Sequence, residues 1–355
     1  MFYLTQSRIL SSQHTVLKIM APSTSARKRS SRSAARNSTT SRSRSRSRSN
    51  SRPSKKSKAS KASQKATSPS LDAFMSSQPY SLSFSPSFFG FYSYMGLITA
   101  LSPTPVSTSG ASAGAMAAAA VASSSNSFKA MLDLKLSDVA DFFPFPLMFR
   151  LGLFRGEKFE NLLKEGYSPN CPTIESCPIP LAISVFDLRT LSSHILTSGS
   201  LSKAARASST FPGLFAPVYY TDWCDSTSSN TQSNSSKLPG YLIDGGIKDV
   251  WGAEGVKHLI ETNHPSFKNL KSKRLVLVMN SGVVSSNLSM PMAEDFYVDE
   301  LFIVVIRCSI KVGPMHMGNG ARVFEAVKKG VEKARVMEAI EKDGRYILEV
   351  DCDEK

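Results

Sequence analysis

Beyond about residue 150, continuous apolar runs of strand length alternate with stretches whose apolar residues recur at helical spacing. Strands that are buried on both faces have such continuous apolar runs. The alternation therefore predicts an α/β domain with a largely parallel sheet covered by helices on both faces. The expected strands lie in residues 180–188, 241–246, 273–282 and 301–310, and the expected helices in residues 156–166 and 320–344, each closed by a glycine.

Residues 73–128 contain no charged side chain. The most apolar part of this stretch, residues 88–101, is shorter than the roughly 20 apolar residues that a transmembrane helix needs. Ser, Thr and Pro also interrupt the chain on both sides of it. We expect this run to form an internal layer of a soluble domain, with a patch that lies on a membrane surface as the alternative.

The beginning of the chain has a different composition. The first 71 residues contain 17 Lys and Arg and no acidic residue, which leaves 26 basic and 28 acidic residues in the remainder. The formal net charge of +15 therefore comes from this segment. Its Ser, Arg and Lys side chains bury too little apolar surface to offset the entropy of ordering the chain. We expect a disordered tail over residues 1–72 and one folded domain over residues 73–355.

Several roles remain open for the tail. Residues 1–20 have the pattern of a short amphipathic helix, which is typical of organelle transit peptides read by an import receptor. The tail could instead contact anionic lipid or nucleic acid, carry phosphorylation sites, or be a solvated extension. A nucleic-acid adaptor is disfavoured because the folded part has no basic excess. We expect an intracellular protein, either cytoplasmic with peripheral membrane association or in a plastid or mitochondrion.

The cysteines indicate free thiols. The chain has five, an odd number, with no C-x-x-C pair and no histidine at metal-ligand spacing. This pattern disfavours structural zinc and a disulfide framework, and it fits a reducing compartment. The five are Cys171, Cys177, Cys224, Cys308 and Cys352.

Residues 110–114, Gly-Ala-Ser-Ala-Gly, match the G-x-S-x-G pattern of a nucleophile elbow. A serine at a sharp turn from strand to helix needs small neighbours two positions away, because the helix packs back against the strand. Gly110 and Gly114 meet this need, and the alanine-rich stretch after Ser112 strongly favours a helix. Ser112 would then lie at a helix N-terminus, where the helix dipole lowers the cost of negative charge.

A second motif follows an apolar run. Asp244 precedes Gly245 and Gly246, and two glycines let the backbone turn tightly and bring another segment close to the carboxylate. Taken alone, the same residues also fit an ordinary turn at a strand end that is capped by an aspartate.

The two motifs together, in this order, resemble the patatin-like phospholipase family, whose signatures are a G-x-S-x-G elbow and a later D-G-G or D-G-A. The segments 149–163, 179–190 and 204–220 are also similar to that family, so the resemblance covers about residues 80–255. It implies a three-layer α/β fold in which a central, mostly parallel sheet is flanked by helices. It also implies a catalytic dyad with Ser112 as the nucleophile and Asp244 as the base, and no metal or organic cofactor.

The histidines do not suggest a catalytic triad. Only His258, His264 and His316 follow Asp244, and none lies in a recognisable catalytic context. We expect each to be an ordinary surface or core residue.

The chain departs from the family upstream of the elbow. The resemblance implies an oxyanion hole formed by the amide of Ala113 and by amides of an upstream glycine-rich loop, for which Phe88, Phe89 and Gly90 are the candidates. Ser85 and Ser87 stand where that loop has glycines, and Pro86 between them has no N–H to donate. The connector at residues 102–110 is also short and polar for a segment that contains a buried strand.

The resemblance implies an enzyme that cleaves carboxylic esters of phospholipids, lysophospholipids or acylglycerols through an acyl-enzyme, at a membrane or lipid-droplet surface. The alternative is a weakly active or inactive patatin-like lipid-binding protein, because losing one oxyanion donor reduces the rate by about 10²–10³. Neither the lipid class nor the oligomeric state follows from the sequence.

Overall fold

A computed structural model describes residues 68–124, 132, 135–144, 152–167, 169–221, 240–281, 289–313 and 316–353. Residues 1–67 of the expected tail lie outside this set, as does most of the Ser- and Asn-rich segment before residue 240. The boundary expected between residues 72 and 73 falls within the first described helix, α2 (Leu71–Ser77).

The domain is built on one ten-stranded, mostly parallel sheet with the order β5-β6-β3-β2-β1-β7-β8-β10-β9, and β4 pairs with β3. The central strands from β3 to β10 run parallel, whereas β4, β5, β6 and β9 pair antiparallel at the two sides. The strands are β1 (Ser81–Phe84), β2 (Ser107–Ala111), β3 (Leu181–Asp187), β4 (Ser192–Leu196), β5 (Val218–Tyr220), β6 (Gly240–Asp244), β7 (Arg274–Asn280), β8 (Glu300–Arg307), β9 (Ile340–Lys342) and β10 (Arg345–Asp351).

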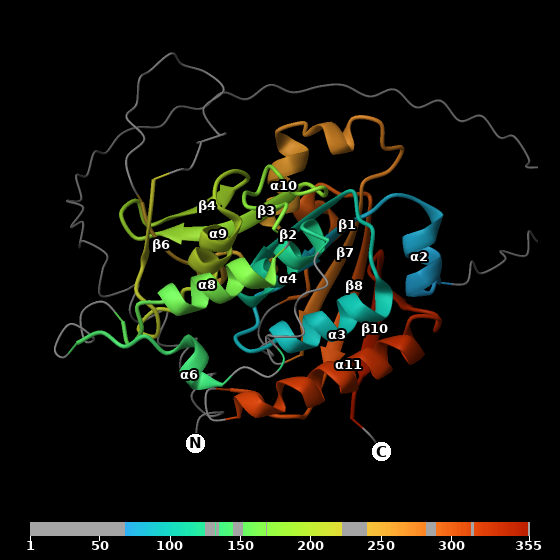
Figure 1. The fold of residues 1–355 in the computed structure, drawn as a ribbon. Helices are drawn as coiled ribbons and strands as arrows, with labels where there is room; N and C mark the ends of the chain where they lie inside the picture. Colours follow the sequence, from blue (N-terminus) through green and yellow to red (C-terminus); the bar gives the residue numbers. More distant parts are fainter. Residues whose placement is uncertain are drawn as a thin grey trace, which may run out of the picture. The chain divides into compact units, whose positions relative to one another are not determined.

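Helices cover both faces of this sheet, so the expected three-layer α/β fold is confirmed. Val276 and Val278 of β7 face α3, α4, α9 and α11, whereas Leu275 and Leu277 of the same strand face α10. In Figure 1, α3 and α11 lie side by side across the sheet. The helices after α2 are α3 (Phe91–Leu101), α4 (Ala113–Ala122), α6 (Leu136–Val139), α8 (Glu157–Gly166), α9 (Leu201–Ser208), α10 (Glu254–Glu261) and α11 (Gly320–Ala334).

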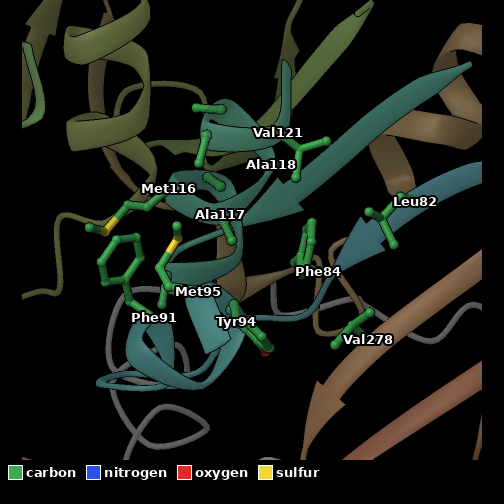
Figure 2. Packing of buried hydrophobic residues seen from close by; sticks show 14 of the residues in the cluster. Leu82, Phe84, Phe91, Tyr94, Met95, Met116, Ala117, Ala118, Val121 and Val278 are labelled. Carbon is green, nitrogen blue, oxygen red and sulfur yellow. The ribbon is translucent and has the colours of Figure 1, made fainter. Parts of the chain in front are cut away.

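The apolar run at residues 88–101 lies inside the domain. Most of it forms α3, which packs with α4 over β1, and Figure 2 shows Tyr94 and Met95 of α3 facing Phe84 and Met116. This packing fits the expected internal layer. Within the described parts of the chain, no helix has the length and apolarity needed to cross a membrane.

The short polar connector contains β2, a fully buried strand at the centre of the sheet. Its serines pair with those of β1: the hydroxyls of Ser81 and Ser107 are 2.9 Å apart and those of Ser83 and Ser109 are 2.8 Å apart. The small side chains also let α10 approach closely, since a Cβ on Gly255 would lie 2.7 Å from the Cβ of Ser109. The buried serine hydroxyls of β2 are therefore satisfied by hydrogen bonds, whereas the buried hydroxyl of Thr108 has no hydrogen-bond partner among the described residues.

The prediction of a helix over residues 320–344 is wrong at its C-terminal end. Helix α11 ends at Ala334, and Arg335 forms an ion pair with Asp72, with a Nε–Oδ2 distance of 2.8 Å. Residues 340–351 form the antiparallel pair β9–β10 instead. Gly344 has a φ of +75° in the turn between these strands, so it closes a hairpin rather than the helix.

Candidate active site

The G-x-S-x-G segment forms a sharp turn from β2 into α4. Ser112 stands between them with φ 57° and ψ −128°, a conformation that costs energy for a residue with a Cβ. A Cβ on Gly110 would lie 2.2 Å from the carbonyl oxygen of Gly114, and a Cβ on Gly114 would lie 2.1 Å from that of Phe84. Helix α4 therefore packs back against β1 and β2 so closely that only glycine fits at these two positions.

The end of α9 holds the strained backbone of Ser112 in place. The amide of Ser112 donates to the hydroxyl of Ser208 at 2.9 Å, and this hydroxyl donates to the carbonyl of Ser184 at 2.6 Å. The hydroxyl of Ser209 donates to the carbonyl of Ser112 at 2.9 Å. Sequence reasoning did not identify these two serines, because a pair of serines at the end of a helix has no distinctive pattern.

Asp244 is at the end of β6 and lies directly against Ser112, although 132 residues separate them in sequence. The hydroxyl of Ser112 donates to Oδ2 of Asp244 at 2.7 Å, and the amide of Gly246 donates to Oδ1 at 2.8 Å. A Cβ on Gly245 would lie 2.0 Å from the carbonyl oxygen of Ser184, so this glycine allows β3 to pass close to the site.

The carboxyl group of Asp244 is poorly solvated. Asp244 is 6% exposed, and burial raises the pKa of its carboxyl group from 3.8 to about 6. The hydrogen bonds from Ser112 and Gly246 lower this pKa, but their effect is smaller than that of burial. A carboxylate with a pKa near 6 is a stronger base than an exposed aspartate and remains ionised at neutral pH. The pair thus has the contact and the basicity needed to transfer a proton from the serine.

Ser112 and Asp244 open into a cavity of about 190 Å³ that is otherwise almost entirely apolar. Apart from these two residues and Ser209, its walls are aromatic and aliphatic side chains. They are Phe88, Phe89, Phe91, Tyr92, Ala113, Met116, Leu136, Val139, Leu153, Phe154, Phe159, Phe211, Leu214, Phe215 and Met317. Such a lining suits a hydrocarbon chain rather than a sugar or a nucleotide.

The four amides expected to form an oxyanion hole differ in their surroundings. The amide of Ala113 is the first of α4 and donates no hydrogen bond to any of the described residues. The same holds for Phe88 and Phe89, which follow Pro86 in the loop between β1 and α3. The amide of Gly90 donates to the carbonyl of Ser87. Ala113, Phe88 and Phe89 therefore remain the candidate donors in this conformation.

No histidine lies between Ser112 and Asp244, which are in direct contact. The recorded side-chain partners of Asp244 are the hydroxyl of Ser112 and the amide of Gly246. His258 lies on α10, and burial lowers its pKa, while His264 pairs with Ser266 at 2.9 Å. Among the residues that the structure describes, no group of three or more His, Cys, Asp or Glu is arranged to hold a metal ion.

A family model described as "Patatin-like phospholipase" matches residues 82–254. No curated protein matches the chain in sequence. Among solved structures, the chain is similar to the crystal structure of VipD from Legionella pneumophila, with 13% sequence identity and a TM-score of 0.35 over 73% of this chain and 67% of that one.

Proposed function

We propose that this chain, whose residues 82–254 match the patatin-like phospholipase family model, is a lipid acyl hydrolase that cleaves carboxylic ester bonds of phospholipids, lysophospholipids or acylglycerols with a Ser112–Asp244 dyad. The observation that carries the proposal is the 2.7 Å hydrogen bond between Ser112 Oγ and Asp244 Oδ2 at the wall of a buried apolar cavity. A base in direct contact with a serine hydroxyl needs no intervening histidine.

The proposed reaction has two halves. The oxygen of Ser112 attacks the ester carbonyl while Oδ2 of Asp244 takes its proton, and the resulting oxyanion is stabilised by amides such as that of Ala113 at the N-terminus of α4. Collapse breaks the ester C–O bond, and the leaving alcohol takes the proton from Asp244. A water molecule then attacks the acyl-enzyme with Asp244 again as the base, and Ser112 regains its proton as the free acid leaves.

Three exposed apolar side chains support a lipid surface as the site of action. Phe88 and Leu136 line the cavity and are 43% and 37% exposed, and Phe142, whose ring is 4.8 Å from that of Phe154, is 57% exposed. Apolar side chains around a cavity mouth can enter the headgroup region of a membrane or lipid droplet. The intracellular location, and contact of the basic tail with anionic lipid, nucleic acid or an import receptor, remain part of the proposal.

The proposal is tested by incubating the full chain with nitrophenyl esters of increasing chain length and with mixed-lipid vesicles, and measuring the released acid. We expect ester hydrolysis that increases with chain length up to the capacity of the cavity. A folded protein that binds the vesicles but hydrolyses none of these esters would support the lipid-binding alternative instead. Two features favour that alternative: Pro86 lacks an N–H, and the amide of Gly90 already donates to the carbonyl of Ser87.

The pH profile of kcat/KM should fall on the acid side of about pH 6. Asp244 can act as the base only when it is ionised, and burial raises its pKa to about 6. Below this pH we expect kcat/KM for a soluble ester to decrease about tenfold per pH unit. The profile is measured with the wild type and with Asp249→Asn.

Asp249 is the matched control for this profile, because burial raises its pKa to about 6 as well. It accepts hydrogen bonds from the hydroxyl of Ser184 and the amides of Ala253 and Glu254, away from Ser112. The acid limb should therefore persist in Asp249→Asn. Loss of the limb in this variant would assign the titration to Asp249 and contradict our account.

Replacing Phe142 by Ser should weaken vesicle binding and the hydrolysis of vesicle lipid about threefold to tenfold, and should spare the hydrolysis of a soluble short-chain ester. Phe142 is exposed beside the cavity but does not line it, so its loss removes apolar surface without altering Ser112. Co-sedimentation and acid release measure the two effects. Ile340→Ser, at a 64% exposed residue of β9, is the control, and an equal effect of both substitutions would contradict a role for the cavity mouth.

A further inference from the structure

The loop of residues 85–90, between β1 and α3, carries two of the three candidate oxyanion donors, and we call it the oxyanion loop. Ser85 and Ser87 occupy two positions of this loop where a glycine-rich loop would have glycines. Neither serine lines the cavity, although Phe88 and Phe89 do. Ser85 is 0% exposed and Ser87 is 8% exposed, so both side chains are buried rather than directed into the cavity.

Tyr94 of α3 binds the first of these serines. Its hydroxyl donates to the carbonyl of Ser85 at 2.8 Å and lies 3.0 Å from the hydroxyl of Ser85. The ring of Tyr94 packs against Phe84, as Figure 2 shows, and the two ring centroids are 5.3 Å apart. Burial raises the pKa of Tyr94, and hydrogen bonds with Ser85, Ser87 and Asn280 oppose the rise. The start of the loop is therefore fixed to α3 by a buried polar contact.

Asn280, the last residue of β7, binds the second serine. Its Nδ2 donates to the hydroxyl of Ser87 at 2.8 Å. The segment that follows β1 stays paired with β7 as far as Ser85, whose amide donates to the carbonyl of Val278 at 2.9 Å. Asn280 also lies against Gly90, where an added Cβ would be 2.2 Å from Nδ2. The amide group of Asn280 thus contacts the loop on both sides of Phe88 and Phe89.

We propose that Asn280, through its hydrogen bond to Ser87, is a positioning residue that holds the oxyanion loop in the conformation needed for catalysis. This inference rests on the proposed function, in which amides of this loop stabilise the oxyanion. Glycines permit such a loop conformation, whereas here the side chains of Ser87 and Asn280 hold it. Because the oxyanion carries its charge only in the transition state and the intermediate, a misplaced loop lowers kcat and leaves KM nearly unchanged.

The test compares the full-length wild type with Asn280→Ala, Ser87→Ala and the double variant on a soluble ester. We expect each single substitution to lower kcat on the order of 10- to 100-fold with little change in KM. The loss in the double variant should be smaller than the product of the two single losses, because both substitutions break the same hydrogen bond. Thr99→Val is the control, since Thr99 donates only to the carbonyl of Met95 within α3, at 2.8 Å, and it should retain wild-type kcat.

Amide hydrogen exchange of the peptide that contains residues 85–91 is the second measurement. Exchange there should be faster in Asn280→Ala than in the wild type, while the strands β7 and β8 retain their protection. A folded Asn280→Ala protein with unchanged exchange in this peptide, or with unchanged kcat, would overturn the inference. If the wild type hydrolyses no ester, the proposed function fails. Faster amide exchange of this peptide in Asn280→Ala would then still show that Asn280 restrains the loop.

Discussion

Ester hydrolysis by Ser112→Ala should be at least about 10⁴-fold slower than by the wild type, and the loss in Asp244→Asn should be of similar size. The first substitution removes the attacking oxygen. The second leaves a side chain of the same shape next to the hydroxyl, but an amide cannot take its proton. Acid release from a soluble ester measures both effects with the full-length chain.

The histidines are the matched controls for this prediction. His258→Ala and His264→Ala should retain nearly full activity, because the carboxylate of Asp244 accepts its hydrogen bonds from Ser112 and Gly246 and not from either ring. A loss of turnover in either variant, comparable to that in Asp244→Asn, would contradict the dyad and favour a triad.

Stability measurements separate a chemical loss from unfolding. The folded pKa of Asp244 is about 6 and the reference value is 3.8, so the wild type is destabilised by ionisation as the pH rises between these values. Asp244→Asn should therefore be more stable than the wild type at pH 8, by up to about 3 kcal/mol. The difference should shrink as the pH is lowered to 4. Thermal unfolding at several pH values measures it.

Gly114→Ala should damage both the fold and the activity. The added Cβ would lie 2.1 Å from the carbonyl oxygen of Phe84, so α4 or β1 has to move. We expect a destabilisation of about 3 kcal/mol. A displacement of Ser112 by about 1 Å would also reduce kcat on the order of 100-fold. Urea unfolding and acid release measure the two effects.

Gly313→Ala is the control for the elbow substitution, because an added Cβ meets nothing within 4 Å there and the backbone needs no positive φ. It should leave stability and turnover close to the wild-type values. If Gly114→Ala were equally harmless, the tight packing of α4 against β1 would not be needed for the elbow.

Local pattern predicted the strongly apolar strands well. The runs at residues 180–188 and 273–282 contain β3 and β7, and β6 and β8 each begin one residue before the runs at residues 241–246 and 301–310. Each is apolar because it is covered on both faces or lies at the centre of the sheet. Helix α8 is likewise within its expected range of residues 156–166, because its apolar residues fall on one face.

The pattern of apolar and polar residues was less informative where contacts between segments distant in sequence determine the structure. Ser107 and Ser109 make β2 look like a loop, but in the folded protein their buried hydroxyls bond to Ser81, to Ser83 and to the carbonyl of Gly252. At the other end of the domain, helical spacing continues past Ala334, but the chain turns there and pairs with β8. The position of β2 and the end of α11 both depend on contacts between distant segments, and the local sequence pattern carries no information about such contacts.

The candidate site divides in the same way. Ser112 and Asp244 stand in short motifs whose glycines have a steric reason, so they could be found from the sequence. Ser208 and Asn280 act through single hydrogen bonds to Ser112 and Ser87. A serine and an asparagine at such places have no motif, and the fold brings Ser208 from the end of α9 and Asn280 from the end of β7 to the site.

The central claim is that the hydroxyl of Ser112 is a nucleophile activated by direct contact with Asp244, at a distance of 2.7 Å. The most direct test is to react the full-length chain with a fluorophosphonate, map the modified residue by mass spectrometry, and compare the labelling rate with that of Asp244→Asn. The account predicts a single adduct on Ser112, formed at least about 100-fold more slowly in Asp244→Asn. An adduct on another residue, or equal rates in the two proteins, would contradict it.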